Sequence, residues 1–98
     1  MSASQITIEE TTTATLSPSV RLGCGNFWEE NYQESGAQKT GATAGLWVLR
    51  SDIRAADHVR VHPGQRLDVP GFKLRVLEVT PGLGLAHGAV RIEVQAAS

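Results

Sequence analysis

The chain has 98 residues, of which 41% are hydrophobic and 19% charged, and its nine basic and ten acidic side chains give a net charge of −1. This length leaves room for one domain with a small core, because a chain of about 100 residues buries only somewhat more than 60% of its unfolded surface. No apolar run approaches the roughly 20 residues that cross a bilayer, which excludes a membrane-spanning helix. The charge balance gives no general attraction to nucleic acid.

The N-terminal segments have the composition of strands. The opening MSASQITIEE carries acidic residues where a secretory signal carries basic ones and then an apolar block, so we expect a cytoplasmic protein. QITIEETTTATL and SVRLGCGNFWEENY are rich in β-branched and aromatic residues, and Gly23 and Gly25 indicate a bulge or corner in the second segment. The single cysteine, Cys24, cannot form an intramolecular disulfide and is interpreted as a small buried or half-buried thiol.

The segment that follows has no large apolar side chain. From Gln33 to Gly45 there is no Val, Ile, Leu, Met or aromatic residue. Loops longer than about twelve residues are uncommon in compact domains and are usually functional or disordered. We therefore predict a flexible loop over residues 33–45 that offers its backbone as an assembly contact. The predicted contact residues are Gln33, Glu34, Ser35, Gly36, Ala37, Gln38, Lys39, Thr40, Gly41, Ala42 and Thr43.

The second half of the chain alternates apolar and polar residues, as half-buried strands do. LWVLR resumes the strand pattern after the loop, and only SDIRAADH could form a helix, as one short turn capped by Ser51 or Asp52. Between Val76 and Leu77 the alternation changes phase, which indicates a bulge. The predicted strands cover residues 59–62, 67–69, 72–76 and 90–94. The glycines assigned to the intervening turns are Gly64, Gly71, Gly82 and Gly84.

These elements predict an all-β fold, a small β-barrel or sandwich of about six to seven short strands with one long flexible loop and at most one short helical turn. We expect residues 1–98 to form one β domain. The consistent phase of the alternation also predicts which residues point inward. The predicted core residues are Val20, Leu22, Val48, Ile53, Val61, Leu67, Val69, Leu74, Val76, Val79, Val90 and Ile92.

The residues that could perform chemistry do not form a catalytic or metal-binding pattern. His58 and His62 are four apart on a predicted strand, His87 is distant, and zinc needs at least three protein ligands. Glu29, Glu30 and Glu34 are clustered in sequence but have no evident partner that would separate their pKa values, so we interpret them as a solvated edge. GLGLAHG precedes a strand and lacks the ending of a phosphate loop. We expect no enzymatic activity, no cofactor and no metal.

Basic residues alternate with core residues in the second half of the chain and could share one outer face of a sheet. These residues are Arg60, Arg66, Lys73, Arg75 and Arg91. We favour solubility and edge protection over nucleic-acid contact as the role of this charged face.

The chain resembles the head-tail joining proteins of long-tailed phages, the family of the phage lambda tail-attachment protein. The likeness lies in LWVLRSDI, VRVHPGQRLDVPGFKLRVLEVTPGLG and VRIEV, preceded by VRLGCGNFWEENY and the long polar segment. The matching positions are Leu46, Val48, Arg50, Asp52, Ile53, Gly64, Leu67, Val69, Gly71, Phe72, Val76, Val79, Pro81, Gly82, Gly84, Val90, Ile92 and Val94.

This resemblance implies a small β-barrel without enzymatic activity that assembles into a ring between the connector of the DNA-filled head and the tail. Its implied partners are copies of itself and the neighbouring connector and tail proteins, with DNA passing through the ring without sequence-specific binding. Such a protein would be found in the host cytoplasm during assembly and then in the neck of the virion. The family also implies that the long loop is mobile in the free subunit and becomes ordered in the ring.

Two alternatives stay open. GQRLDVPGFKLRVLEV and VRIEVQA also resemble the strands of the small carbon-storage RNA-binding regulators, which would make this chain a nucleic-acid-binding module. Those regulators are much shorter, and the charge balance here gives no general attraction to RNA. The other alternative is an interaction domain of a different injection or surface machine.

Overall fold

The computed structural model describes residues 4–34, 36–82 and 87–97, which form eight strands and no helix. The prediction of an all-β barrel or sandwich is confirmed, with eight strands instead of six to seven. Within the described residues no helix is long and apolar enough to cross a membrane. The strands are β1 (Ser4–Glu9), β2 (Thr13–Ser17), β3 (Val20–Glu34), β4 (Ala37–Arg50), β5 (Ala55–Val61), β6 (Arg66–Val69), β7 (Phe72–Thr80) and β8 (Ala89–Ala96).

The strands form two antiparallel sheets, each with four strands. Sheet A has the order β1-β8-β7-β6, and sheet B has the order β2-β3-β4-β5. The chain crosses between the sheets through residues 10–12 and again through residues 62–65. The second crossing is tied to β7 by backbone hydrogen bonds from Gly64 N to Val76 O, 2.7 Å, and from Val76 N to Gln65 O, 2.8 Å. The strand order therefore follows the chain around the molecule, and β1 completes the circuit beside β8.

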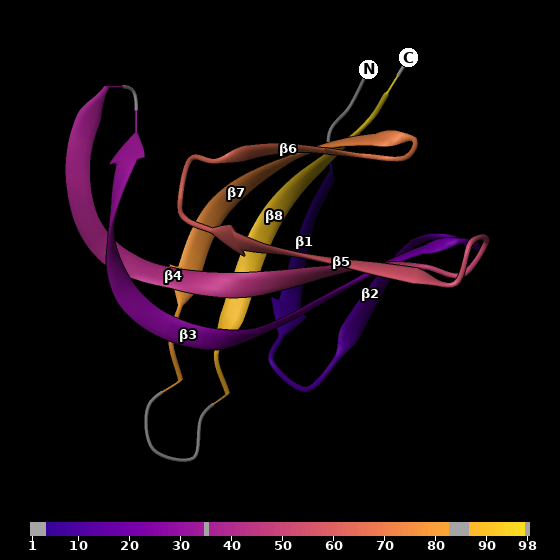
Figure 1. The fold of residues 1–98 in the computed structure, drawn as a ribbon, viewed down its shortest axis with the longest axis horizontal. Coiled ribbons are helices and arrows are strands. Elements are labelled where there is room, and N and C mark those ends of the chain that lie inside the picture. The colour runs from indigo at the N-terminus through magenta and orange to yellow at the C-terminus, as the bar shows by residue number, and fades with distance from the viewer. Residues whose placement is uncertain (1–3, 35, 83–86, 98) are drawn as a thin grey trace.

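The two sheets face each other across a small core (Figure 1). In this view β7, β8 and β1 run behind β3 and β4 and cross them at a steep angle, and the start of β1 lies beside the end of β8. The β3–β4 hairpin continues beyond the core and bends away at the left of the picture. This extension gives the molecule a projecting part that the remaining strands do not cover.

The core consists of the inward-facing side chains of both sheets. Of the residues predicted to point inward, those buried are Val20, Leu22, Val48, Val61, Leu74, Val76, Val79, Val90 and Ile92. Leu67 and Val69 are only partly buried, because β6 is an edge strand of sheet A. Ile8, Cys24, Ala44 and Leu46 complete the buried cluster.

Two of the strands contain β-bulges near the positions that the sequence pattern indicated. The pairing of β7 with β8 shifts between Val76 and Glu78, so Leu77 is the extra residue of a bulge. In β3 the pairing with β4 shifts between Gly25 and Trp28. The hairpin between β6 and β7 turns at Gly71, whose φ of 84° is the left-handed conformation that glycine adopts without strain.

The predicted flexible loop over residues 33–45 is wrong as a description of the backbone. Residues Ala37–Arg50 are β4 and pair with β3, and the register Glu34↔Ala37 leaves two residues for the turn. Gly36 has a φ of 79° in this turn, and Ser35 lies outside the described residues. Most of the segment lacks large apolar side chains because it forms a strand outside the core, and only its end, at Thr43, Ala44 and Gly45, is buried. A lack of large apolar residues therefore does not exclude strand pairing.

The segment SDIRAADH also differs from expectation. Residues 51–54 form a turn with Arg54 at a φ of 50°, and Ala55 already begins β5. Ile53 lies in this turn and is 59% exposed, so its assignment to the core is wrong. The alternation that points β4 side chains inward ends with the strand, and the turn directs Ile53 to solvent.

The core position of Ile92 gives a test of the fold. Ile92 is fully buried opposite Ile6 on β1 and Val76 on β7. Ile92→Asp should abolish soluble folding, because an unpaired buried charge costs several kcal/mol and small domains have only about 5–15 kcal/mol of stability. Gln95→Asp, at an exposed position of the same strand, should change the stability by about 0.5 kcal/mol or less. Soluble yield and thermal melting by circular dichroism measure both, and a normal melt for Ile92→Asp would contradict this core.

Candidate functional site: the β3–β4 arm and its base

The candidate site is a two-stranded arm formed by the distal parts of β3 and β4. It comprises Trp28–Glu34 and Ala37–Thr43, which pair from Trp28↔Thr43 to Glu34↔Ala37. β2 pairs with β3 only as far as Gly23, and β5 pairs with β4 only from Ala44. Each strand of the arm therefore has one hydrogen-bonded neighbour and one open edge. The predicted assembly residues Gln33, Glu34 and Gly36–Thr43 belong to this arm and its turn.

A β-bulge separates the arm from the body of sheet B. Gly25 pairs with Gly45 and Trp28 with Thr43, so two residues of β3 lie opposite one of β4. Asn26 is one of these two and has a φ of 52°, a left-handed conformation that asparagine tolerates better than most residues. A bulge bends its strand and increases the twist. The direction of the arm relative to the core is therefore set at this point.

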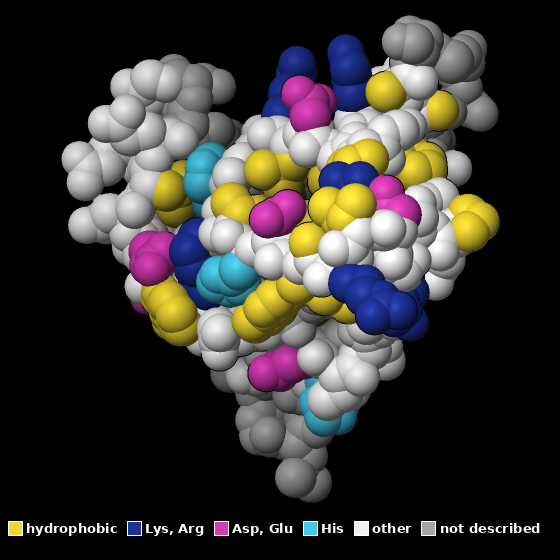
Figure 2. All heavy atoms as spheres, turned by 45° about the vertical axis from the view of Figure 1, so that its right-hand side comes forward, with side chains coloured by type: hydrophobic (Ala, Val, Ile, Leu, Met, Phe, Trp, Pro, Cys, Tyr) yellow, Lys and Arg dark blue, Asp and Glu magenta, His cyan; other side chains and the backbone are white. Residues whose placement is uncertain are grey.

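Side chains of β5 lie against aromatic rings of the hairpin along the outer face of sheet B. The Arg60 guanidinium lies 3.7 Å from the ring centre of Trp28. The His62 ring stacks on Tyr32 with centroids 4.3 Å apart and an interplanar angle of 13°. Figure 2 shows histidine, basic and hydrophobic side chains adjoining on part of this surface. A third contact with an aromatic ring, that of His58 of β5 with Trp47, lies in the four-stranded part of sheet B.

This body contact joins His58 to Trp47, whose rings are 4.5 Å apart and tilted by 52°. Gly45 makes room for it, because a Cβ atom at Gly45 would lie 2.5 Å from His58 Nε2. Alternate residues of a strand share one face, so His58 and Arg60 of β5 lie in a row, which His62 continues directly after the strand. We call these three cross-strand pairs the aromatic ladder: His58 with Trp47, Arg60 with Trp28, and His62 with Tyr32.

Arg60 is the central contact of the ladder and holds the base of the arm. Its Nη1 donates to the Asn26 carbonyl oxygen at 2.6 Å, and its Nη2 donates to Thr43 Oγ1 at 2.6 Å. The Thr43 hydroxyl lies 3.0 Å from the Trp28 carbonyl oxygen, to which it donates. Arg60 Nε lies 3.9 Å from a carboxylate oxygen of Glu30. One side chain of β5 thus connects the bulge, β3 and β4.

Glu30 is held in its charged form at the same place. The indole N–H of Trp28 donates to its carboxylate, and this hydrogen bond lowers the pKa of Glu30 below its ordinary value, with smaller contributions from Arg60 and Thr43. We interpreted Glu30 as part of a solvated edge, whereas the structure makes it a partner of the arm base. At neutral pH its negative charge offsets the positive charge of Arg60.

The structure divides the predicted charged face. Arg66, Lys73 and Arg75 lie on sheet A and line a common hollow. Arg91 is also on sheet A and forms an exposed ion pair with Glu78 at 4.0 Å. Arg60 lies on sheet B, so its assignment to the same face is wrong. Its position follows from the chain crossing between the sheets after β5, which the alternation of residues within one strand does not reveal.

The remaining predicted residues lie apart from the arm base. Gly64, with a φ of 87°, lies in the second crossing, Gly82 follows β7, and Gly84 lies outside the described residues. His87 is exposed and precedes β8. Within residues 4–34, 36–82 and 87–97, no three His, Cys, Asp or Glu side chains gather in a way that would hold a metal ion.

Cys24 is buried in the core, as the sequence indicated. Its Sγ donates to the Ile8 carbonyl oxygen at 3.1 Å. Burial raises the pKa of the thiol to about 11, with a further contribution from the charge of Glu10. Because the thiolate is the nucleophilic form of cysteine, this residue is unreactive at neutral pH.

Sequence reasoning missed the aromatic ladder. The alternation of His58, Arg60 and His62 on a predicted strand was the available signal, since it places the three side chains on one face. Their partners could not be identified, because Trp28 and Tyr32 lie beyond a bulge whose position decides which face they occupy.

Removing Arg60 should release the arm from β5. Arg60→Ala should destabilise the protein by about 2 kcal/mol, because it removes a cation–π contact and two hydrogen bonds. Amides of Trp28–Gln33 and Ala37–Thr43 should exchange faster with solvent, while those of β7 stay slow in the folded state. Arg21→Ala, at an exposed position of β3, should leave the exchange of the arm unchanged. Equal arm protection in Arg60→Ala and the wild type would show that Arg60 does not hold the arm.

Replacing Trp28 should alter the titration of Glu30. Trp28→Phe keeps an aromatic ring for Arg60 but removes the indole N–H, so the pKa of Glu30 should rise toward its ordinary value. In the wild type the lowered pKa means that the stabilisation by Glu30 is present above the ordinary carboxyl range and is lost as the pH falls through the folded-state pKa. NMR titration of the Glu30 carboxyl carbon measures this difference. An identical titration midpoint in both proteins would show that the hydrogen bond from Trp28 does not cause the lowered pKa of Glu30.

No protein-family model, curated protein or solved structure matches this chain. Its function therefore has to be inferred from the geometry of the described residues. The arm is the feature with the clearest consequence for function, because it carries open backbone edges outside the core.

Proposed function

We propose that this protein is an assembly subunit of a phage or prophage virion, a head-tail joining protein that forms a ring with copies of itself through the β3–β4 arm. The observation that carries the proposal is the arm, which projects from the core with an open edge on each strand (Figure 1). Its position along the chain coincides with the polar segment that suggested an assembly contact, although it is a strand pair instead of a loop.

The open edges suit pairing with another chain. Among the strands of the described residues, none pairs with the outer edge of β3 beyond Gly23 or with the edge of β4 before Ala44. Unpaired N–H and C=O groups along an edge are a template for adding a strand. Such addition obtains affinity from main-chain hydrogen bonds and needs little apolar area. The small and polar composition of Gly36–Thr43 is compatible with this mode of contact.

The distal arm is held within one subunit by its own strand pairing and by a side-chain hydrogen bond from Thr40 to Asn31. Gln38 and Thr40 are exposed, and the contacts from Arg60 of β5 and from His62 lie at Trp28 and Tyr32, near the base of the arm. A two-stranded ribbon alone is only marginally stable in water. A second copy that pairs with its edge would add the neighbour that a wider sheet supplies. We therefore expect the distal arm to be fully ordered only when the subunits assemble.

A structural role is supported over catalysis by the chemistry of the arm base. Arg60 and Glu30 form an ion pair, and each is also hydrogen-bonded to the surrounding strands. These contacts hold the hairpin and β5 together. The Thr43 hydroxyl, 3.3 Å from a Glu30 carboxylate oxygen, is part of the same network, because it also contacts the Trp28 carbonyl oxygen and accepts a hydrogen bond from Arg60.

Shortening the arm tests this proposal. Deleting Asn31–Glu34 together with Ala37–Thr40 removes residues in register pairs and leaves Glu30 opposite Gly41 at the turn. The shortened subunit should keep its fold but stay monomeric, whereas the wild type should form closed rings. Gln38→Thr keeps the length and the backbone edges of the arm, so this control should assemble normally. Light scattering after gel filtration gives the mass, and electron microscopy shows whether the oligomers are rings.

Two results would contradict the proposal. One is a shortened subunit that assembles like the wild type. The other is a wild-type chain that stays monomeric at every accessible concentration. Circular dichroism of the shortened subunit separates failed assembly from failed folding, because the core pairs up to Gly25↔Gly45 are retained.

A further inference from the structure

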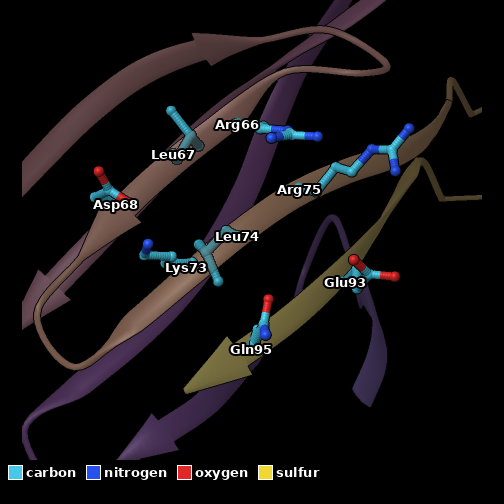
Figure 3. A pocket seen from close by; sticks show the side chains of 8 residues that line it. All are labelled: Arg66, Leu67, Asp68, Lys73, Leu74, Arg75, Glu93 and Gln95. Carbon is cyan, nitrogen blue, oxygen red and sulfur yellow. The ribbon is translucent and has the colours of Figure 1, made fainter. Parts of the chain in front are cut away.

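Two arginines lie directly opposite each other on the outer face of sheet A. Arg66 of β6 pairs in register with Arg75 of β7, and the short hairpin through Pro70 and Gly71 fixes their relative position. Both line a hollow of about 350 Å³. Figure 3 shows the two guanidinium groups toward the same end of this hollow, whereas Lys73 lies at the opposite end with Asp68.

This arrangement leaves the two arginines without a salt bridge among the described residues. Like charges directly opposite each other on adjacent strands destabilise a sheet. Among the described residues neither Arg66 nor Arg75 forms an ion pair or side-chain hydrogen bond, in contrast to Arg50, which pairs with Asp52 at 2.8 Å. Glu93 is opposite Arg75 on β8 and lines the same hollow, but it does not pair with either arginine.

We propose that Arg66 and Arg75 form a binding site for a phosphate group, either as a free anion or as part of a nucleic-acid backbone. Guanidinium groups bind phosphate through pairs of parallel hydrogen bonds, and two of them on adjacent strands can contact different oxygens of the same group. A bound phosphate would neutralise the repulsion between the two arginines. The site lies on the opposite sheet from the arm base and does not depend on the proposed assembly function.

The neighbouring side chains define the limits of the site. Lys73 lies opposite Asp68 on β6, so its charge is partly balanced at the far end of the hollow. Gln95 lines the hollow and offers a neutral amide as a further hydrogen-bond donor. Glu93 repels an anion placed beside Arg75. Removing the charge of Glu93 should therefore strengthen binding, whereas removing either arginine should weaken it.

The test uses the full chain with sodium phosphate as the probe and NMR chemical shifts as the readout. Ionic strength is held constant with sodium chloride. Amides around Arg66 and Arg75 should shift with saturation, and Arg66→Gln should weaken the affinity by about tenfold or more, as expected for the loss of charged hydrogen bonds. Glu93→Gln should tighten binding by about two- to fivefold. Arg91→Gln, which removes a cation paired with Glu78 elsewhere on sheet A, should have little effect.

A second titration distinguishes the two sources of phosphate. A single-stranded oligonucleotide that shifts the same amides at lower concentration than inorganic phosphate would identify a nucleic-acid backbone as the ligand. Binding of inorganic phosphate with no tighter binding of the oligonucleotide would identify a small anion. Either result supports the site only if Arg66→Gln abolishes or weakens it.

Three results would overturn the proposal. The first is the absence of saturable shifts with either probe. The second is equal affinity in Arg66→Gln and the wild type, with both proteins folded by circular dichroism. The third is an equal response to acetate at the same ionic strength, because it would show general attraction of anions instead of recognition of phosphate.

Discussion

The antiparallel pairing of β3 with β4 is the constraint on which the rest of the molecule depends. The two strands contain 15 and 14 residues and stay paired from Val20↔Arg50 to Glu34↔Ala37. Their inner halves contribute Leu22 and Leu46 to the core, and their outer halves leave it. The arm therefore has the rigidity of a core strand pair at one end and open edges at the other. A flexible loop of the same length would have no fixed direction.

The bulge after Gly25 gives the two halves of the hairpin different surroundings. In an uninterrupted strand Gly25 would share its face with residues 27, 29 and 31, since side chains alternate. The extra residue places Trp28 on the face of Gly25 instead, and Tyr32 follows on the same face. The rings can then meet Arg60 of β5 and His62, which directly follows β5, while Phe27 packs against the core. A single inserted residue thus produces both the bend of the arm and the contacts that hold it.

The arginines on the outer faces of the two sheets differ in the partners that surround them. On sheet B, Arg60 is covered by an aromatic ring, bonded to backbone and side-chain oxygens, and placed near Glu30. On sheet A, Arg66 and Arg75 face each other and form no salt bridge with any described residue. A net charge of −1 therefore does not describe the local charge on either face. The contrast supports separate roles, in which Arg60 holds the arm and the paired arginines bind an external anion.

The sequence by itself determined the features that depend on neighbouring residues. Alternation identified the strands of the second half, the phase change at Val76 located a bulge, and the inward phase selected most of the core. These predictions succeeded because side-chain direction in a strand follows from local backbone geometry. The same reasoning failed at Ile53, because the turn after β4 ends the alternation.

Only the tertiary structure decided the features that depend on strand partners. The apolar-poor stretch looked like a loop because nothing within it shows that β3 supplies hydrogen bonds along its length. Arg60 looked like one more cation of a charged face, yet its hydrogen-bond partners Asn26 and Thr43 are 34 and 17 residues away in the chain. The opposition of Arg66 and Arg75 likewise depends on the register of β6 with β7. Pairing and register arise from the packing of the whole sheet, so residue type and local spacing alone do not specify them.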